Sequence, residues 1–455
     1  TNIEYLVEQT GATRILLAIP SASRHRRRAV LERLSDFPVH VQTIPEISDL
    51  VSGKAKVDDI RDVEVADLLG RDSVPPDDKL LRASIDGRTV MVTGAGGSIG
   101  SELCRQIILL GPRCLVLFEM SEIALYTVES ELRRAADAAR IDCEIVGLLG
   151  SVHHEARVRE ALQTYKICTV YHAAAYKHVP VVEHNILEGV YNNVFGTLHL
   201  AKAAIEAGVD TFVLISTDKA VSPTSVMGAT KRLAELILQA LQKEYPATCF
   251  SMVRFGNVLA SSGSVVPLFR DQIRRGGPVT VTHREMIRYF MTIPEAAQLV
   301  IQAGSMAKGG DVFVLDMGQP VKIQDLARRM INLMGLTVRD DRNPDGDIAI
   351  KYTGLRPAEK LYEELLIGND VSGTSHPRIM RATESFIDLD ELTVLLDELR
   401  EAALNLDRNL VREVLKRSVT EYAPSNGVED LVFARQRGER PEHSDKVINI
   451  TSRLG

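Results

Sequence analysis

A glycine-rich segment between an apolar run and a helical pattern constrains the fold of this chain more than any other feature. Residues 89–93 predict a buried strand and residues 101–109 predict an amphipathic helix. Glycines between them let the backbone turn tightly and let a pyrophosphate approach the helix N-terminus, whose N–H groups attract anions. The alternative is a tight turn without a ligand. The residues expected to contact a dinucleotide are Gly94, Gly97, Ser98, Ile99 and Gly100.

Strands and helices alternate after this segment, which predicts an α/β fold with a doubly wound parallel sheet. The next strand, 114–118, ends in Glu119, close to the ~20 residues beyond the glycines where an acidic side chain takes the ribose hydroxyls. This carboxylate favours NAD over NADP because it would repel a 2′-phosphate, and no arginine follows it directly. A solvated loop glutamate is the alternative. Further strands are expected at 144–148 and 169–172, with a helix at 154–165 between them.

Small residues follow the strand at 169–172. Ala173 and Ala174 would let the backbone approach a flat cofactor ring, and Tyr176, Lys177 and His178 then offer polar contacts. Three histidines of this stretch also invite interpretation as metal ligands, namely His172, His178 and His184. Their spacing fits neither one helix face nor a zinc motif, so we expect no metal site.

Polar side chains close the apolar run at 212–215 and mark the expected centre of chemistry. Thr217, Asp218 and Lys219 lie where the carboxyl end of a parallel strand meets ligands. Lys231 opens the helical pattern of residues 231–243, and Met227 precedes it by one turn, so both side chains share one face. A salt bridge between Asp218 and Lys219 that merely closes the strand is the alternative.

Three arginines lie outside regular helix beside glycine, proline or aromatic residues, namely Arg254, Arg288 and Arg356. Such arginines would suit a diphosphate, although isolated arginines are more often surface residues. Asn257 follows the first of them in a strand-to-loop segment.

The composition narrows the classes of function. A formal charge of -7 and a pI near 5.9 argue against broad nucleic-acid binding. Five scattered cysteines without a C-x-x-C pair fit a reducing compartment and predict neither a disulfide framework nor a zinc site. No apolar run approaches the ~18 residues that span a bilayer, and no signal peptide opens the chain. Because the first residue is Thr1, an upstream segment is expected.

The length of 455 residues predicts two or more domains. We expect an N-terminal α/β module at 1–66, a linker at 67–84, the dinucleotide and substrate regions at 85–385, and a helical tail at 386–455. The tail helices would cap the domain or bury a partner helix, and the chain after Ala423 is expected to be partly disordered.

Smaller elements complete these predictions. The module would place a helix at 26–34 between strands at 15–19 and 39–43, and its basic run at 24–28 would form a solvated helix face or meet anionic lipid. Packing helices of a smaller C-terminal domain are expected at 326–334 and 361–366.

Several motifs together resemble CapD/WbpM-type polysaccharide-biosynthesis proteins, which are UDP-N-acetylglucosamine 4,6-dehydratases of the extended short-chain dehydrogenase superfamily. The motifs lie at residues 93–100, 172–180, 216–220, 228–231, 288–292 and 356–360. The N-terminal piece is similar to the module that follows transmembrane helices in the large branch of that family. Met227 stands where the wider superfamily has a tyrosine, as in this branch, and Ala358 replaces a usual glycine.

The resemblance implies a reaction with NAD as internal hydride carrier. Asp218 would protonate the leaving C6 hydroxyl and Lys219 would take the C5 proton, which requires a protonated Asp218 and a neutral Lys219. Thr217 would bond the C4 hydroxyl in place of the missing phenol, and Lys231 would hold the nicotinamide ribose. Met227 would only fill space.

The resemblance also implies partners. The substrate would be UDP-N-acetylglucosamine, and the full-length protein would be a homo-oligomer anchored at the cytoplasmic face of the inner membrane, with this chain as a soluble part. A UDP-sugar epimerase or reductase, which normally keeps the tyrosine, and a non-catalytic nucleotide-sensing protein are the alternatives. The expected substrate contacts are Lys177, His178, Arg254, Asn257, Val266, Thr282, Arg288, Arg356 and Glu359.

Overall fold

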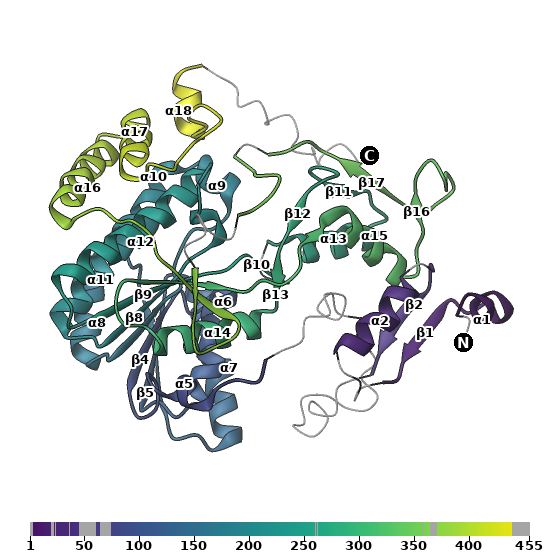
Figure 1. The fold of residues 1–455 in the computed structure, drawn as a ribbon, viewed down its shortest axis with the longest axis horizontal. Coiled ribbons are helices and arrows are strands. Elements are labelled where there is room, and N and C mark those ends of the chain that lie inside the picture. Colours follow the sequence, from purple (N-terminus) through teal and green to yellow (C-terminus); the bar gives the residue numbers. More distant parts are fainter. Residues whose placement is uncertain are drawn as a thin grey trace.

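The computed structural model describes residues 3–19, 22, 24–35, 37–44, 61–63, 74–259, 261, 263–356, 358–364 and 371–438. A large sheet covered by helices forms the main body, and a smaller lobe lies between this body and the N-terminal module (Figure 1).

In the described part of the chain, nine strands form one sheet in the order β18-β19-β14-β9-β8-β7-β4-β5-β6. The parallel strands are β4 (Thr89–Thr93), β5 (Cys114–Glu119), β6 (Glu144–Leu149), β7 (Thr169–His172), β8 (Thr211–Ile215), β9 (Cys249–Arg254) and β14 (Asp311–Leu315). The antiparallel strands at one edge are β19 (Ile379–Ala382) and β18 (Val371–Gly373). The strand order reverses between β4 and β7, which confirms the predicted doubly wound sheet and locates its ligand crevice.

Helices cover both faces of this sheet. One face carries α5 (Asp78–Arg82), α6 (Ser98–Ile108), α7 (Glu122–Ala139) and α14 (Ile293–Ser305). The other face carries α8 (Glu155–Tyr165), α11 (Gly196–Ala207) and α12 (Val226–Glu244). The tail helices α16 (Leu389–Leu404) and α17 (Arg408–Ser418) pack over α12, so the prediction that they cap the domain is confirmed.

The smaller lobe follows β9 and has a core of its own. Its helices α13 (Val265–Arg274) and α15 (Ile323–Leu333) pack on β11 (Val279–Val281), β17 (Ile348–Tyr352) and β16 (Val338–Arg339). Two short strand pairs extend this lobe, β10 (Asn257–Val258) with β13 (Phe290–Met291) and β12 (Ile287–Arg288) with β15 (Val321–Lys322).

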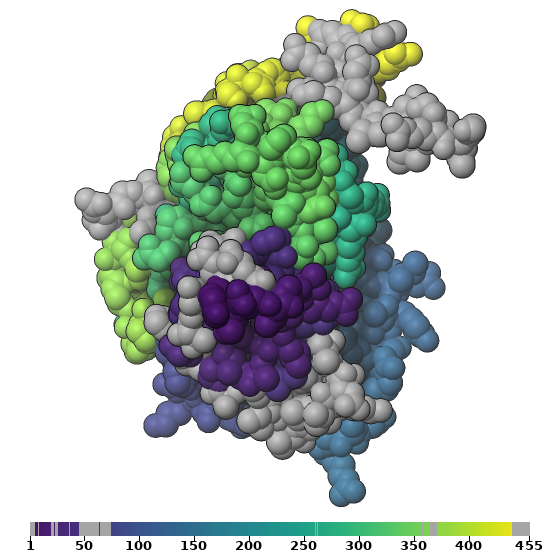
Figure 2. Space-filling view, turned by 90° about the vertical axis from the view of Figure 1, so that its right-hand side faces the viewer, coloured from purple at the N-terminus to yellow at the C-terminus, as the bar shows by residue number. Residues whose placement is uncertain are grey.

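The N-terminal module contains α1 (Ile3–Thr10), β1 (Arg14–Leu17), α2 (Arg24–Leu34), β2 (His40–Thr43) and β3 (Arg61–Asp62). The parallel pairing of β1 with β2 confirms the predicted βαβ unit. Leu31 and Val41 form a small core with Leu333 of α15, so the module packs against the smaller lobe (Figure 2).

Several predicted boundaries need correction. Helix α12 begins at Val226 because Ser225 caps it, five residues before the predicted start. Residues 361–364 are not helical, and the rest of that predicted helix lies outside the described residues. The expected linker contains α5, which packs against α14, and its residues 67–73 lie outside the described residues. Residues 423–438 are described and include α18 (Leu431–Gln436), while 439–455 lie outside the described residues, so the expected partial disorder stays a prediction. Among the described residues, no helix combines the length and apolar character that crossing a bilayer requires.

Candidate active site

The glycine-rich turn lies where the strand order reverses, and close backbone contacts require its glycines. Gly94 has a φ of +65°, and a Cβ atom there would lie 2.7 Å from the Cα atom of Ala174. A Cβ atom on Gly100 would lie 2.0 Å from the Gly94 carbonyl oxygen. Ser98 and Ile99 begin α6, the position at which helix N–H groups attract an anion.

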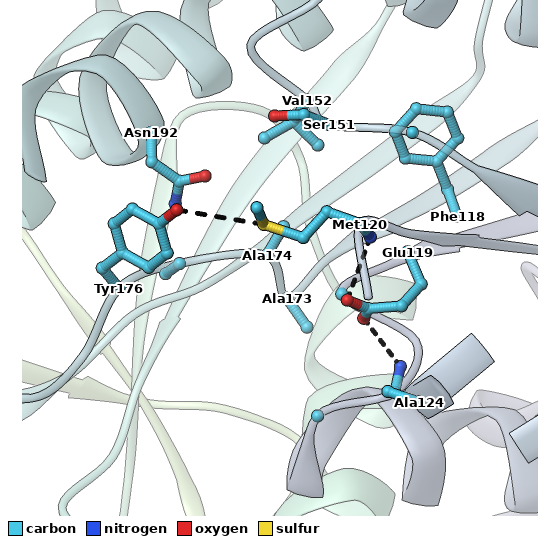
Figure 3. Close-up of a pocket in the computed structure, with 15 residues that line it drawn as sticks. Phe118, Glu119, Met120, Ala124, Ser151, Val152, Ala173, Ala174, Tyr176 and Asn192 are labelled. Atoms are coloured by element: carbon cyan, nitrogen blue, oxygen red, sulfur yellow. Dashed lines mark hydrogen bonds between the residues drawn. The ribbon is translucent and has the colours of Figure 1, made fainter. Parts of the chain in front are cut away.

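A cavity of about 290 Å³ opens beside this turn (Figure 3). Small residues and a few polar groups line it, as expected for a site that holds a flat ring against backbone. Its predicted lining residues are Gly94, Gly97, Glu119, Ala173 and Ala174, and its other lining residues include Met120, Ser151, Val152, Tyr176 and Asn192.

Glu119 is held rigidly at this cavity. Its carboxylate accepts hydrogen bonds from the backbone N–H groups of Gly96 at 2.9 Å, Met120 at 3.0 Å and Ser121 at 2.9 Å. The residue is buried, which excludes a solvated loop glutamate. A carboxylate has about four acceptor positions, so one remains for a ligand.

Met120 and Asn192 line the cavity without a clear signal in the sequence, whereas Tyr176 was expected to offer a polar contact. Met120 and Tyr176 point toward one another across the cavity, with the Tyr176 hydroxyl 3.9 Å from the Met120 sulfur (Figure 3). Asn192 belongs to a π-helix, Val190–Phe195, and its neighbour Asn193 accepts the Tyr176 N–H at 2.8 Å and donates to the Tyr176 carbonyl at 3.0 Å. Such π-helical turns are frequent at functional sites.

His172 is a core residue. Its Nδ1 lies 2.7 Å from Thr93 Oγ1 and its Nε2 lies 3.0 Å from Thr197 Oγ1. Burial, reinforced by Lys231, lowers the pKa of His172 to about 3, so its ring is neutral. Among the described residues, no group of three or more His, Cys, Asp or Glu side chains is placed to hold a metal ion.

The polar end of β8 brings Thr217, Asp218 and Lys219 together. Asp218 Oδ1 accepts hydrogen bonds from Thr217 Oγ1 at 2.9 Å and Lys219 Nζ at 2.9 Å. The Asp218 side chain is 1% exposed, and its Oδ2 has no hydrogen-bond partner among the described residues. Gly256 leaves room beside that oxygen, since a Cβ atom there would lie 3.0 Å from it. A buried unpaired oxygen of this kind is available to a ligand.

Two carboxylates act on the charge of Lys219. Burial lowers the pKa of this lysine, but Asp218 and then Glu363 outweigh burial and raise the pKa above its ordinary value. Lys219 and Asp218 therefore form an ion pair in the arrangement seen here, and the neutral Lys219 that the reaction needs stays a prediction.

Lys231 and Met227 lie on α12 one turn apart, so the predicted shared helix face is confirmed. Burial lowers the pKa of Lys231 to about 8, because Glu235 offsets only part of the desolvation. Met227 is buried in the hydrophobic core.

Residues of the smaller lobe face the Lys219 end of the site. Arg288 donates hydrogen bonds to the carbonyls of Ile287, Lys360 and Leu361, and its Nη2 lies 3.7 Å from Glu359 Oε1. Glu359 Oε1 also accepts the Thr282 hydroxyl at 3.5 Å.

The Arg356 segment contains the alanine that stands where the resembling motif has glycine. Arg356 is exposed, and its backbone N–H donates to Glu359 Oε2 at 3.0 Å. Ala358 has a φ of +57°, the left-handed region that favours glycine.

Two expected substrate contacts need correction. Arg254 is 1% exposed and pairs with the carboxylates of Glu235 and Glu384, so its guanidinium is not available to a diphosphate. The Val266 side chain is buried in the core of the smaller lobe.

Three other expected contacts lie in loops or short strands around the site. Lys177 and His178 are exposed on the loop after β7, and a Cβ atom on Gly263 would lie 2.5 Å from the His178 ring. Asn257 lies on β10, which pairs with β13.

Known proteins are similar to this chain in sequence and in fold. The chain is 47% identical over 377 residues, 83% of its length, to the capsular polysaccharide biosynthesis protein CapD of Staphylococcus aureus, and it spans only 61% of that relative. It is 32% identical over 63% of its length to the UDP-glucose 4-epimerase of Rickettsia canadensis, of which it covers 79%. The X-ray structure of Pen from Bacillus thuringiensis matches with a TM-score of 0.58 and 32% identity, over 67% of this chain and 90% of that chain.

A family profile covers the same region. Residues 90–384, well over half of the chain, match the family described as polysaccharide biosynthesis protein. This range contains the glycine-rich turn, the Asp218–Lys219 pair and the smaller lobe, and the chain therefore belongs to the polysaccharide biosynthesis protein family.

Proposed function

We propose that this chain is the catalytic part of an NAD-dependent UDP-N-acetylglucosamine 4,6-dehydratase that serves surface polysaccharide or glycan synthesis. One observation carries the assignment: the buried Asp218 forms a hydrogen-bonded pair with the partly buried Lys219, and Asp218 Oδ2 has no partner among the described residues. A dehydration needs a proton donor and a proton acceptor side by side, which this pair provides.

The cavity at the glycine-rich turn fits NAD, which when bound supplies the acceptor and later the donor of a hydride. The N-terminus of α6 would bind the pyrophosphate. Glu119 would accept the ribose hydroxyls with the acceptor position that its three backbone bonds leave. Because this carboxylate would repel a 2′-phosphate, we infer NAD rather than NADP.

The ion pair reaches a reactive state through one internal proton transfer. If Lys219 passes a proton along the 2.9 Å hydrogen bond to Asp218, the pair becomes a carboxylic acid and a free amine. Asp218 then protonates the leaving C6 hydroxyl and Lys219 takes the C5 proton, which restores both original charges. Exclusion of water by the substrate favours the uncharged form, because burial disfavours charge.

Neighbouring groups would orient the sugar and the nucleotide. Thr217 would bond the C4 hydroxyl. Its Oγ1 lies 2.9 Å from Asp218 Oδ1 and therefore beside the proposed proton donor. Lys231 would hold the nicotinamide ribose. The exposed Arg356 guanidinium would contact the diphosphate, and Glu359 would accept uridine ribose hydroxyls.

A UDP-sugar 4-epimerase is the second candidate, because one relative at 32% identity carries that name. An epimerase needs proton transfer at C4 alone, so the adjacent acid and base at Asp218 and Lys219 favour the dehydratase. Met227 in place of the superfamily tyrosine also disfavours an epimerase.

Purified protein incubated with UDP-N-acetylglucosamine tests the assignment. Mass spectrometry should detect loss of water and a keto group in the product. A mass-neutral change at C4 would establish the epimerase, and unchanged sugar with tight binding would establish a non-catalytic role. Cofactor released by denaturation should be NAD by chromatography, and recovery of mainly NADP would refute the role of Glu119.

A further inference from the structure

A second carboxylate, Glu363, lies near Lys219 in addition to Asp218 and approaches from the smaller lobe. Its side chain is 4% exposed, and its Oε1 lies 3.7 Å from Lys219 Nζ and 3.7 Å from Arg288 Nη2. Its Oε2 has no hydrogen-bond partner among the described residues. Residues 361–364 form neither helix nor strand, so no periodic pattern in the sequence indicates this placement.

The free Oε2 distinguishes Glu363 from the structural carboxylates of this protein. Glu235 is equally buried, but its Oε1 accepts hydrogen bonds from Ser216 and Arg254, and its Oε2 pairs with Arg232 and Arg254. A buried carboxylate oxygen without a partner costs stability, so its retention points to a role beyond packing.

We propose that Glu363 is a positioning residue of the proposed dehydratase, which holds the Lys219 amine between two carboxylates and sets its charge. The role of Lys219 as the C5 base rests on the proposed function, whereas its position between Asp218 and Glu363 does not.

The charges around Lys219 act on the protonation of its amine. Asp218 at 2.9 Å and Glu363 at 3.7 Å both favour the ammonium, and Arg288 opposes them. Glu359 lies 3.7 Å from Arg288 and partly balances that cation. Glu363 therefore helps to keep the proton on Lys219 while the site is empty, and this is the proton that Asp218 must later donate.

Removal of the Glu363 charge should therefore make Lys219 lose its proton at lower pH. The Glu363→Gln variant keeps the shape of the side chain and removes one carboxylate 3.7 Å from Nζ. Coulomb interaction at this separation predicts a fall of at least about one pH unit in the midpoint of Lys219 deprotonation.

Competitive labelling measures that midpoint without substrate. Lys219 is 22% exposed, so acetic anhydride added over a range of pH and followed by peptide mass spectrometry reports its free amine. The matched control is Glu364→Gln, because Glu364 is the adjacent carboxylate, is 57% exposed and lies 4.0 Å from Lys360. We expect a lower midpoint in the Glu363 variant and no change in the control. An unchanged midpoint in folded Glu363→Gln protein overturns the inference, whatever reaction the enzyme catalyses.

Two further measurements complete the test. If Glu363→Gln fails to fold, Glu363→Asp retains the charge at greater distance and should give a smaller fall, and no fall would overturn the inference. In active protein, the alkaline limb of kcat should move with the labelling midpoint while KM stays within about twofold. A labelling shift without movement of that limb would show that Glu363 sets a charge that turnover does not use.

Discussion

At the scale of single residues, the hydrogen-bond partners of a buried charge distinguish reactive from structural groups. Arg254 and Glu235 form a hydrogen-bonded ion pair in the core, as expected for residues with a structural role. Asp218 is buried to a similar degree but keeps one oxygen without a partner among the described residues, next to the space that Gly256 leaves. This difference supports the proposal that Asp218 contacts the substrate.

Lys219→Met should separate the two halves of the proposed reaction. The variant retains C4 oxidation but loses the C5 base, so reduced cofactor should accumulate when UDP-N-acetylglucosamine is added. Absorbance of the reduced nicotinamide and deuterium incorporation at C5 measure the two steps, and the wild type should show little reduced cofactor but C5 exchange. If the variant folds and binds UDP but forms no reduced cofactor, Lys219 acts earlier in the reaction, as the base for the C4 hydroxyl.

Lys231→Met should stabilise the cofactor-free protein while it impairs turnover. The pKa of Lys231 falls from 10.5 to about 8 on folding, so the unfolded chain binds the extra proton between these values and wild-type stability rises with pH there. At pH 7 the native state bears the whole cost of the buried ammonium, which the variant removes, a gain of up to about 3 kcal/mol. Urea unfolding at pH 7 and pH 10 measures the difference in the free energy of unfolding between variant and wild type, which should be smaller at pH 10. The exposed Lys202→Met is the control, and a variant no more stable than wild type at pH 7 would refute the prediction.

At the scale of elements, the N-terminus of α12 sets the geometry of the site. The Ser225 side chain accepts the Gly228 N–H at 3.1 Å, and Glu183 accepts the Val226 N–H at 2.6 Å. These caps begin the helix early enough to place Met227 and Lys231 in its first two turns. Helix geometry then puts both side chains on one face.

Met227→Leu should be tolerated, because the thioether neither donates nor accepts the protons of this reaction and leucine preserves its bulk in the core. Turnover of the proposed substrate should stay within about tenfold of wild type. A loss beyond about a hundredfold, nearly 3 kcal/mol of transition-state stabilisation, would assign Met227 a direct role.

At the scale of the whole molecule, the two ends of the chain are attached very differently. Leu392, Leu399, Val411, Val414 and Leu415 of the tail are fully buried and belong to the core that contains α12. Among the described residues, the N-terminal module has a small core of its own that includes Leu333 of the lobe. Its other contacts with the lobe include a hydrogen bond of 2.6 Å from Asn332 Nδ2 to the Ser35 carbonyl and a β-bridge between His40 and Met334.

A chain that ends at residue 385 should therefore fail to fold, whereas a chain that begins at residue 74 should fold and retain turnover. Loss of five buried aliphatic side chains, at about 2 kcal/mol each, lowers the free energy of unfolding by about 10 kcal/mol. This loss is comparable to the stability of a whole domain. Calorimetry should show no cooperative transition for the first variant and one for the second. A stable product from the first variant would mean that the tail is a detachable cap.

Local patterns in the sequence determined the sheet class, the glycine-rich turn, the carboxylate that follows β5 and the adjacent Asp218 and Lys219. These features were predictable because strand and helix periodicity, tight turns and side-chain neighbours within one turn depend on residues close in the chain.

Only the tertiary structure decided which charges meet. Arg254 resembled a ligand arginine in its own segment, but Glu384 arrives from the end of the sheet and Glu235 from α12, and together they neutralise it. Asp218, its neighbour in the sequence, and then Glu363 raise the pKa of Lys219, and Glu363 approaches from the smaller lobe, 144 positions later in the chain. Electrostatic energies depend on separation in space and on burial, and neither quantity is encoded in the local pattern around these residues.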